Sequence, residues 1–171
     1  MIIRFWKRRF LLVEGALAVV LTIGFAVWYW GFDGAAPTSA LLGGNRAALY
    51  GTTASISGSL LGFVITATSI VLGFSASDRL AVVRESQQYP MLWKTFSASI
   101  RALAAATIVA LLCLLLDRDS APHPWLIVAL VFSVLLSVLR LARTIWALEH
   151  IIALVTRPLP KRTRNHDGGQ E

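Results

Sequence analysis

Charge is scarce in this sequence. Charged residues make up 15% of its 171 residues, whereas hydrophobic residues make up 56%. A soluble domain of this length is typically about a quarter charged and about half apolar. The mean hydropathy is +0.67, and the apolar residues form four long runs separated by short stretches that hold nearly all the charge. This blocky pattern argues against a soluble core, which scatters its apolar residues at helical or strand periods, and predicts an all-α, polytopic membrane protein.

Groups that commonly build catalytic or metal sites are also missing. The single cysteine, Cys113, excludes an internal disulfide bond; it lies in an apolar run, where it is expected to face lipid or another helix. The histidines His123, His150 and His166 lie too far apart to have the spacing of metal ligands. No nucleophile–base pattern and no phosphate-binding loop is present. We therefore expect no metal, no cofactor and no enzymatic activity.

Positive charge exceeds negative charge, with 16 lysines and arginines against 9 acids and a net charge of +7. In a soluble protein such an excess would suggest nucleic acid as the partner. Here the basic residues flank the apolar runs, so anionic lipid headgroups are the expected partner and nucleic acid is not.

The four runs predict the organisation of the chain. Each is long enough to span a bilayer, and together they predict a four-helix transmembrane bundle within a single domain, residues 1–156. The predicted spans cover residues 10–31, 49–74, 96–116 and 125–147. The first run resembles a signal peptide in its basic start, but its length and its final Trp28–Trp30 predict an uncleaved anchor.

The connections are short. Residues 33–48 are expected to form a loop in which Thr38–Leu42 makes a turn of helix. Residues 77–90 have an amphipathic pattern that ends near Pro90 and predict a short interfacial helix. The turn at 117–124 predicts antiparallel neighbours, the last helix is expected to continue to about Val155, and the basic tail 157–171 is expected to be disordered.

The basic residues also predict the orientation. Only Arg46 and Arg118 of the 16 lysines and arginines lie in the first and third loops. By the positive-inside rule both termini and the central segment are therefore cytoplasmic, in the inner membrane of a cell. Aromatic residues predict the same two interfaces: Trp28, Tyr29, Trp30, Tyr50 and Trp125 on the outer side, and Trp6, Tyr89, Trp93 and Trp146 on the inner side.

Small residues recur every four positions in the second run. They are Ala54, Gly58, Gly62 and Thr66, and Ser69 and Gly73 continue the series. Small side chains let two helix backbones approach closely within lipid. Three interpretations stay open: packing inside one chain, an interface between copies in a homo-oligomer, or the wall of a pore lined by hydroxyl groups.

Glu14 is the only acid inside an apolar run. An unpaired carboxylate is costly there, and Arg101 and Arg140 fall in the same membrane leaflet by residue count. We therefore predict a buried ion pair of Glu14 with Arg101, Arg140 or both; the alternative is that all three side chains extend to the headgroups. A glutamate in the first of four spans is also similar to small multidrug transporters, which implies a proton-coupled transporter as an alternative function.

The stretch Ala48–Ala67, followed by Ser77–Leu80, resembles a pattern in small uncharacterised prokaryotic integral membrane proteins, a resemblance that implies no activity. From the residues themselves we expect a small oligomeric channel or permeation assembly. The alternative is an accessory or anchoring subunit in which residues 75–95 and the tail bind a cytoplasmic protein partner.

Overall fold

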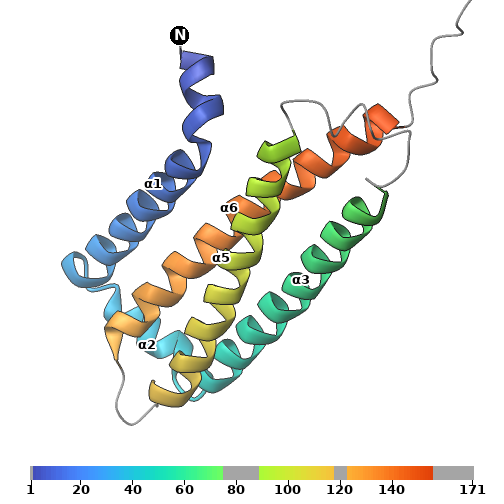
Figure 1. The fold of residues 1–171 in the computed structure, drawn as a ribbon. Coiled ribbons are helices and arrows are strands. Elements are labelled where there is room, and N and C mark those ends of the chain that lie inside the picture. The colour runs from blue at the N-terminus through green and yellow to red at the C-terminus, as the bar shows by residue number, and fades with distance from the viewer. Residues whose placement is uncertain (1, 75–88, 118–122, 156–171) are drawn as a thin grey trace, which may run out of the picture.

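The chain is entirely helical in the part that the structure describes. The computed structural model describes residues 2–74, 89–117 and 123–155, and the all-α prediction is confirmed there (Figure 1). The helices are α1 (Ile2–Gly31), α2 (Ala35–Leu42), α3 (Arg46–Phe74), α5 (Tyr89–Leu116) and α6 (Pro124–Val155). The predicted interfacial helix at 77–90 and the predicted disordered tail lie largely or wholly outside the described residues.

Four of these helices are long and apolar enough to cross a membrane. The candidate spans are Leu12–Gly31, Arg46–Ile70, Trp93–Leu116 and Pro124–Glu149, close to the predicted runs. Many of their large apolar side chains face outward; Phe63 is 73% exposed and Leu115 is 67% exposed. A soluble monomer rarely exposes so much apolar surface. The length of these helices and their outward apolar surface are typical of a multi-pass membrane protein.

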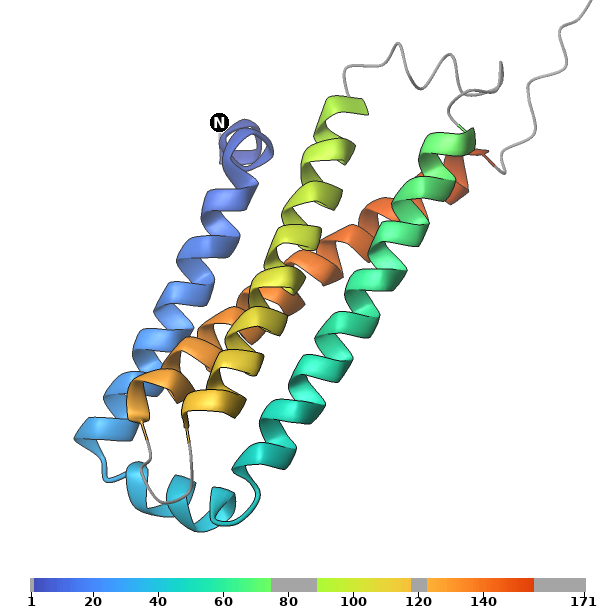
Figure 2. The ribbon, with the colours of Figure 1, turned by 60° about the horizontal axis from the view of Figure 1, so that its bottom comes forward.

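The four long helices pack on one another in the order α1, α6, α5, α3. Neighbours in this series run antiparallel, and Figures 1 and 2 show α1 and α3 on opposite flanks of α5. The bundle is thus an open series, because α1 and α3 make no extensive contact with each other. We call the end where α1 and α5 finish and α3 and α6 begin the loop end, and the opposite end the terminal end.

α2 connects α1 to α3 at the loop end and includes the predicted turn of helix at Thr38–Leu42. The turn before it is tight, since Asp33 has a φ of 52°, in the left-handed region that Asp tolerates better than most residues. A Cβ atom on Gly34 would lie 2.8 Å from the Trp28 ring. Only glycine fits this approach.

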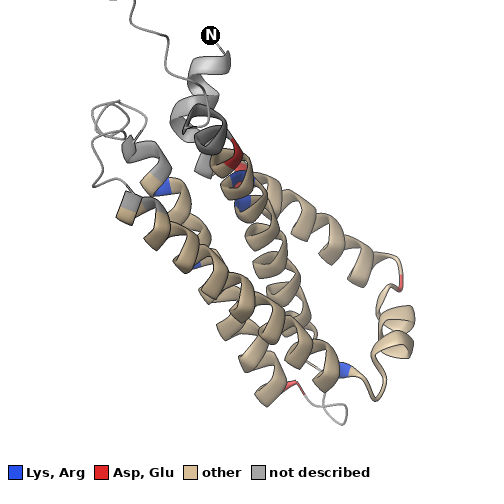
Figure 3. Cartoon of the chain, turned by 90° about the vertical axis from the view of Figure 1, so that its right-hand side faces the viewer, with Lys and Arg blue, Asp and Glu red and all other residues tan. Residues whose placement is uncertain are grey.

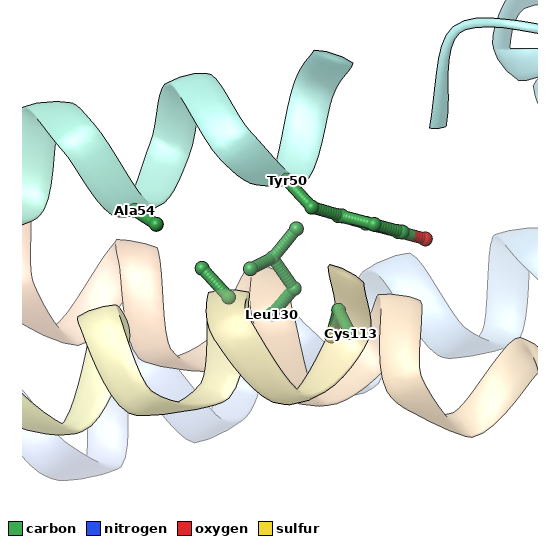
Figure 4. Packing of buried hydrophobic residues seen from close by; sticks show 5 residues of the cluster. Tyr50, Ala54, Cys113 and Leu130 are labelled. Carbon is green, nitrogen blue, oxygen red and sulfur yellow. The ribbon is translucent and has the colours of Figure 1, made fainter. Parts of the chain in front are cut away.

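The buried core lies among α3, α5 and α6. One cluster contains Tyr50, Ala54, Ala110, Cys113 and Leu130 (Figure 4). A second cluster nearer the terminal end contains Val64, Phe96 and Leu103. Cys113 therefore faces the helices rather than lipid, and its thiol donates a hydrogen bond to the Leu126 carbonyl over 3.4 Å.

Small residues on α5 make this close packing. Four alanines one turn apart are all buried: Ala98, Ala102, Ala106 and Ala110. Because α5 lies between α3 and α6, small side chains let both neighbouring backbones approach it. Hydroxyl groups then bridge to α6, where Ser137 donates to the Ala102 carbonyl over 3.0 Å and the Ser99 and Thr144 hydroxyls lie 2.5 Å apart.

Candidate functional site

One face of α3 packs against α5. The residues on this face alternate at spacings of four and three: Tyr50, Ala54, Ser57, Leu61, Val64 and Thr68. All are buried except Leu61, which is half-buried and packs on the second cluster. This spacing keeps one seam of a helix in contact with a neighbour that crosses at a small angle. The face is thus the ordinary packing surface of the bundle.

A second seam with the same spacing lies on the opposite side of α3. It consists of Thr52, Ser55, Ser59, Gly62, Thr66, Ser69 and Gly73, all of them exposed and all of them small or hydroxyl-bearing. Two residues separated by two positions point about 200° apart on a helix, so a seam through Thr52 faces away from one through Tyr50. We call these seven residues the α3 seam. It contains no large apolar side chain, unlike the neighbouring exposed residues Ile56 and Phe63.

The predicted strip at intervals of four crosses both faces of α3. Ala54 is buried against α5, Gly58 is half-buried, and Gly62, Thr66, Ser69 and Gly73 are exposed. Each step of four residues advances the direction by about 40°, so the strip turns from the packed face toward the outward one. The structure therefore brings Ala54 into the packing of the chain and leaves the last four residues on the α3 seam.

At the loop end, Asp117 joins three segments of the chain. Its Oδ2 atom accepts a hydrogen bond from Arg46 Nη1 over 2.8 Å and another from the Tyr50 hydroxyl. Its Oδ1 atom accepts the backbone N–H of His123 over 2.7 Å. The Arg46 and Asp117 side chains are 6% and 0% exposed. We call Arg46, Tyr50, Asp117 and the His123 amide the Asp117 cluster.

The Asp117 cluster pairs two charged side chains that would each be unfavourable alone at their positions. Arg46 begins α3 and Asp117 follows the end of α5, so each has the wrong sign for its own helix dipole. Burial alone raises the pKa of the Asp117 carboxyl, but the hydrogen bonds from Tyr50, the His123 amide and Arg46, with the Arg46 charge, outweigh it. The net effect is a pKa below the usual value, so the carboxylate is ionised and the cluster is a structural tie.

This tie does not follow from the sequence pattern. The aromatic pattern predicts Tyr50 in a belt at the outer interface, whereas in the structure Tyr50 is completely buried and its hydroxyl donates to Asp117. Trp30 and Trp125 of the predicted belt are exposed, and their rings are in tilted contact with centroids 4.7 Å apart. The available signal was Arg46 itself, a basic residue on the side that the positive-inside rule leaves nearly free of charge.

A second charged cluster joins α1 to α6 nearer the terminal end. Arg143 Nη1 lies 2.5 Å from Glu14 Oε1, and both side chains are largely buried. Arg140 lies one turn away on α6, close enough for electrostatic attraction to the Glu14 carboxylate. The structure pairs Glu14 with Arg143, whereas the sequence predicted Arg101, Arg140 or both. The reason is that α1 packs mainly on α6, and the turn of α6 that meets Glu14 carries Arg143.

Arg101 is not part of that ion pair. Its side chain is exposed, and its Nε atom donates to the Ser97 carbonyl of its own helix over 3.1 Å. Arg140 instead donates from Nη1 to the Ala98 carbonyl over 3.1 Å. Figure 3 shows charged residues of the described chain at the loop end and in the half of the bundle toward the terminal end, with uncharged helix between the two groups. We call Glu14, Arg140 and Arg143 the Glu14 cluster.

The described residues contain no group of three His, Cys, Asp or Glu side chains that could hold a metal ion. Comparison with known protein families, with curated protein sequences and with solved structures finds no match to this chain. Function must therefore be argued from the α3 seam and the two charged clusters.

Proposed function

We propose that this protein is a non-enzymatic subunit of a small homo-oligomeric channel, with the α3 seam facing the symmetry axis. In this proposal the protein lies in the cytoplasmic membrane of the cell with both termini inside. The observation that carries the proposal is the α3 seam, a continuous outward line of small and hydroxyl-bearing residues on a helix at the edge of the bundle.

The seam has the length that a pore wall needs. From Thr52 to Gly73 it covers 21 residue steps, which is about 32 Å at 1.5 Å per residue. The hydrocarbon core of a bilayer is about 30 Å thick. A seam that served only as a local contact between helices would not need to continue through the whole core.

The seam has a composition that suits contact with a partner or with water better than contact with lipid. Glycine and hydroxyl side chains let copies of α3 approach closely, and hydroxyl oxygens can also contact water in a pore. Thr66 and Ser69 donate to carbonyls of their own helix, over 3.0 and 2.9 Å, which leaves lone pairs of their oxygens available to water. An uncharged lining of this kind favours small neutral or weakly selected solutes over a specific ion.

The first experiment tests assembly through substitution of one glycine. Gly62→Ile places a branched side chain on the seam, where a Cβ atom meets nothing within 4 Å inside the chain. Gly24→Ile on α1 is the matched control, because Gly24 is also exposed and has the same open space. We expect Gly62→Ile alone to reduce the oligomer seen by mass photometry or native mass spectrometry in nanodiscs. A monomeric wild-type protein would remove the proposal.

The second experiment separates a pore from a dry interface. In a Cys113→Ala background, Ser59→Cys and Thr66→Cys are treated with a membrane-impermeant thiol reagent, with Phe63→Cys as the lipid-facing control. A pore predicts modification of the two seam cysteines, block of conductance in planar bilayers, and no modification at position 63. Disulfide cross-linking between copies without modification or conductance would keep the oligomer and exclude the channel.

The transporter alternative is weaker than the channel. A proton-coupled transporter needs a carboxylate that is free to exchange a proton with its substrate. Glu14 is instead engaged by Arg143 and lies near the charge of Arg140, which favours a structural ion pair over a proton carrier. Binding of a cytoplasmic partner by the central segment stays a prediction, since most of that segment lies outside the described residues.

A further inference from the structure

Two guanidinium groups are anchored side by side on α5. Arg101 Nε donates to the Ser97 carbonyl and Arg140 Nη1 donates to the Ala98 carbonyl, each over 3.1 Å. Ser97 and Ala98 are consecutive residues, whose Cα atoms are about 3.8 Å apart. Arg101 comes from α5 and Arg140 from α6. The backbone of α5 therefore holds two like charges close together, and their repulsion acts on Arg140.

The nearest acid does not balance the positive charge around it. Glu14 attracts Arg140, while its Oε1 atom lies 2.5 Å from Arg143. Glu14 Oε2 and Arg140 Nε are both buried without a hydrogen-bond partner among the described residues. Glu14 thus contributes one negative charge beside Arg101, Arg140 and Arg143, and the described cluster keeps a surplus of positive charge that favours an anion.

No other acid in the described part of the chain lies beside Arg140. Asp33 and Asp117 belong to the loop end, and Glu149 is exposed nine residues along α6 from Arg140, about 13 Å away along the helix.

We propose that Arg101 and Arg140 bind the phosphate group of an anionic phospholipid. Guanidinium groups match phosphate oxygens with paired hydrogen bonds, and the phosphate would accept from the exposed guanidinium of Arg101, with the charge of Arg140 beside it. The level fits a headgroup: Ser97 follows Trp93 by four residues, about 6 Å along the helix, and Trp93 is an exposed aromatic residue of the kind found at membrane interfaces. The site is independent of the proposed pore.

The surface next to Arg101 favours a lipid over a free phosphate ion. The same outward face of α5 continues away from the terminal end through exposed Ala105, Ile108, Leu112 and Leu115, at spacings of four and three. A headgroup on Arg101 would thus leave its acyl chains along an apolar track on α5. A free phosphate ion has no acyl chains, so it would gain nothing from this apolar surface.

The test measures lipid binding to the full-length protein and to Arg101→Gln. Lys94→Gln is the matched control, since Lys94 is exposed and lies one heptad before Arg101 on nearly the same face of α5. Native mass spectrometry with phosphatidylglycerol and phosphatidylcholine reports the selectivity. We expect Arg101→Gln to weaken phosphatidylglycerol binding at least about tenfold, as for the loss of one charge-assisted hydrogen bond, with phosphatidylcholine binding unchanged in both variants.

The outcomes are distinguishable. Retention of phosphatidylglycerol binding by Lys94→Gln together with its loss in Arg101→Gln supports the site. Equal losses in the two variants would show a diffuse surface charge and overturn it. Competition by millimolar inorganic phosphate in the absence of any preference for phosphatidylglycerol would overturn the lipid assignment. Arg101→Gln decides the test because its side chain is exposed, whereas Arg140 also joins α6 to α5 and its replacement could disturb the fold.

Discussion

Single residues at the loop end hold helices together that are far apart in the sequence. Asp117 connects the start of α3 to the turn between α5 and α6, through Arg46, Tyr50 and the His123 amide. Both carboxylate oxygens accept hydrogen bonds, so the carboxylate is well satisfied despite complete burial. Removing the carboxylate therefore removes charge-assisted hydrogen bonds, which are stronger than neutral ones.

We expect Asp117→Asn to lower the free energy of unfolding by about 1.5–3 kcal/mol, the range for a hydrogen bond to a charged group. The variant removes the carboxylate that the buried Arg46 side chain, 6% exposed, contacts at this end of the bundle. Denaturant unfolding in detergent micelles measures the change. Asp33→Asn is the control, since Asp33 is exposed at the same end and should change stability by no more than about 0.5 kcal/mol.

Acid should weaken the same tie. The pKa of Asp117 in the folded protein lies below its usual value, which is about 3.9 in an unfolded chain. The unfolded state therefore takes up a proton at higher pH than the folded state, so this contribution is present above about pH 5 and is lost as pH falls through the folded pKa. Unfolding between pH 3 and pH 7 should show a steeper loss of stability in the wild type than in Asp117→Asn. Parallel curves would contradict the assignment.

At the scale of elements, the positions of the helices in the sequence follow from the apolar runs. Which face of each helix packs against a neighbour does not follow from them. The predicted spans agree with the candidate spans to within about one turn at most ends, because hydrophobic length is a local property of the sequence. The ion-pair partner of Glu14, in contrast, depends on which helix packs against α1. Arg101, Arg140 and Arg143 all lie at a suitable depth, and only the packing of α1 on α6 selects Arg143.

A charge swap between α1 and α6 tests this contact. Glu14→Arg should lower the free energy of unfolding by about 1.5–3 kcal/mol, the range for a hydrogen bond to a charged group, and adding Arg143→Glu should restore most of the loss. Adding Arg101→Glu instead should restore little, because Arg101 lies on α5 and is bonded to Ser97. Better rescue by Arg101→Glu than by Arg143→Glu would show that α1 meets α5.

At the scale of the whole molecule, α1 is attached chiefly through α6. Ala18 is completely buried on α1, whereas Val20 on the same helix is 63% exposed. We expect Ala18→Leu to destabilise the protein by about 1–3 kcal/mol through overpacking, and Val20→Leu to have little effect. Unfolding measurements on both variants in the same detergent check this. Equal effects would mean that α1 is not seated on α6 as described.

The sequence alone determined that the described chain is all-α and where its four helices long and apolar enough to cross a membrane lie, because hydrophobic length and charge scarcity are properties of consecutive residues. The tertiary structure decided the order of packing and which face of each helix meets a neighbour. In the folded chain Tyr50 is buried, Arg46 pairs with Asp117, Glu14 pairs with Arg143 and the α3 seam faces outward. These outcomes depend on how each helix is rotated about its axis and on which helices are neighbours. A shift of one residue along a helix turns the facing side chain by about 100°, so a small difference in spacing changes which residues meet.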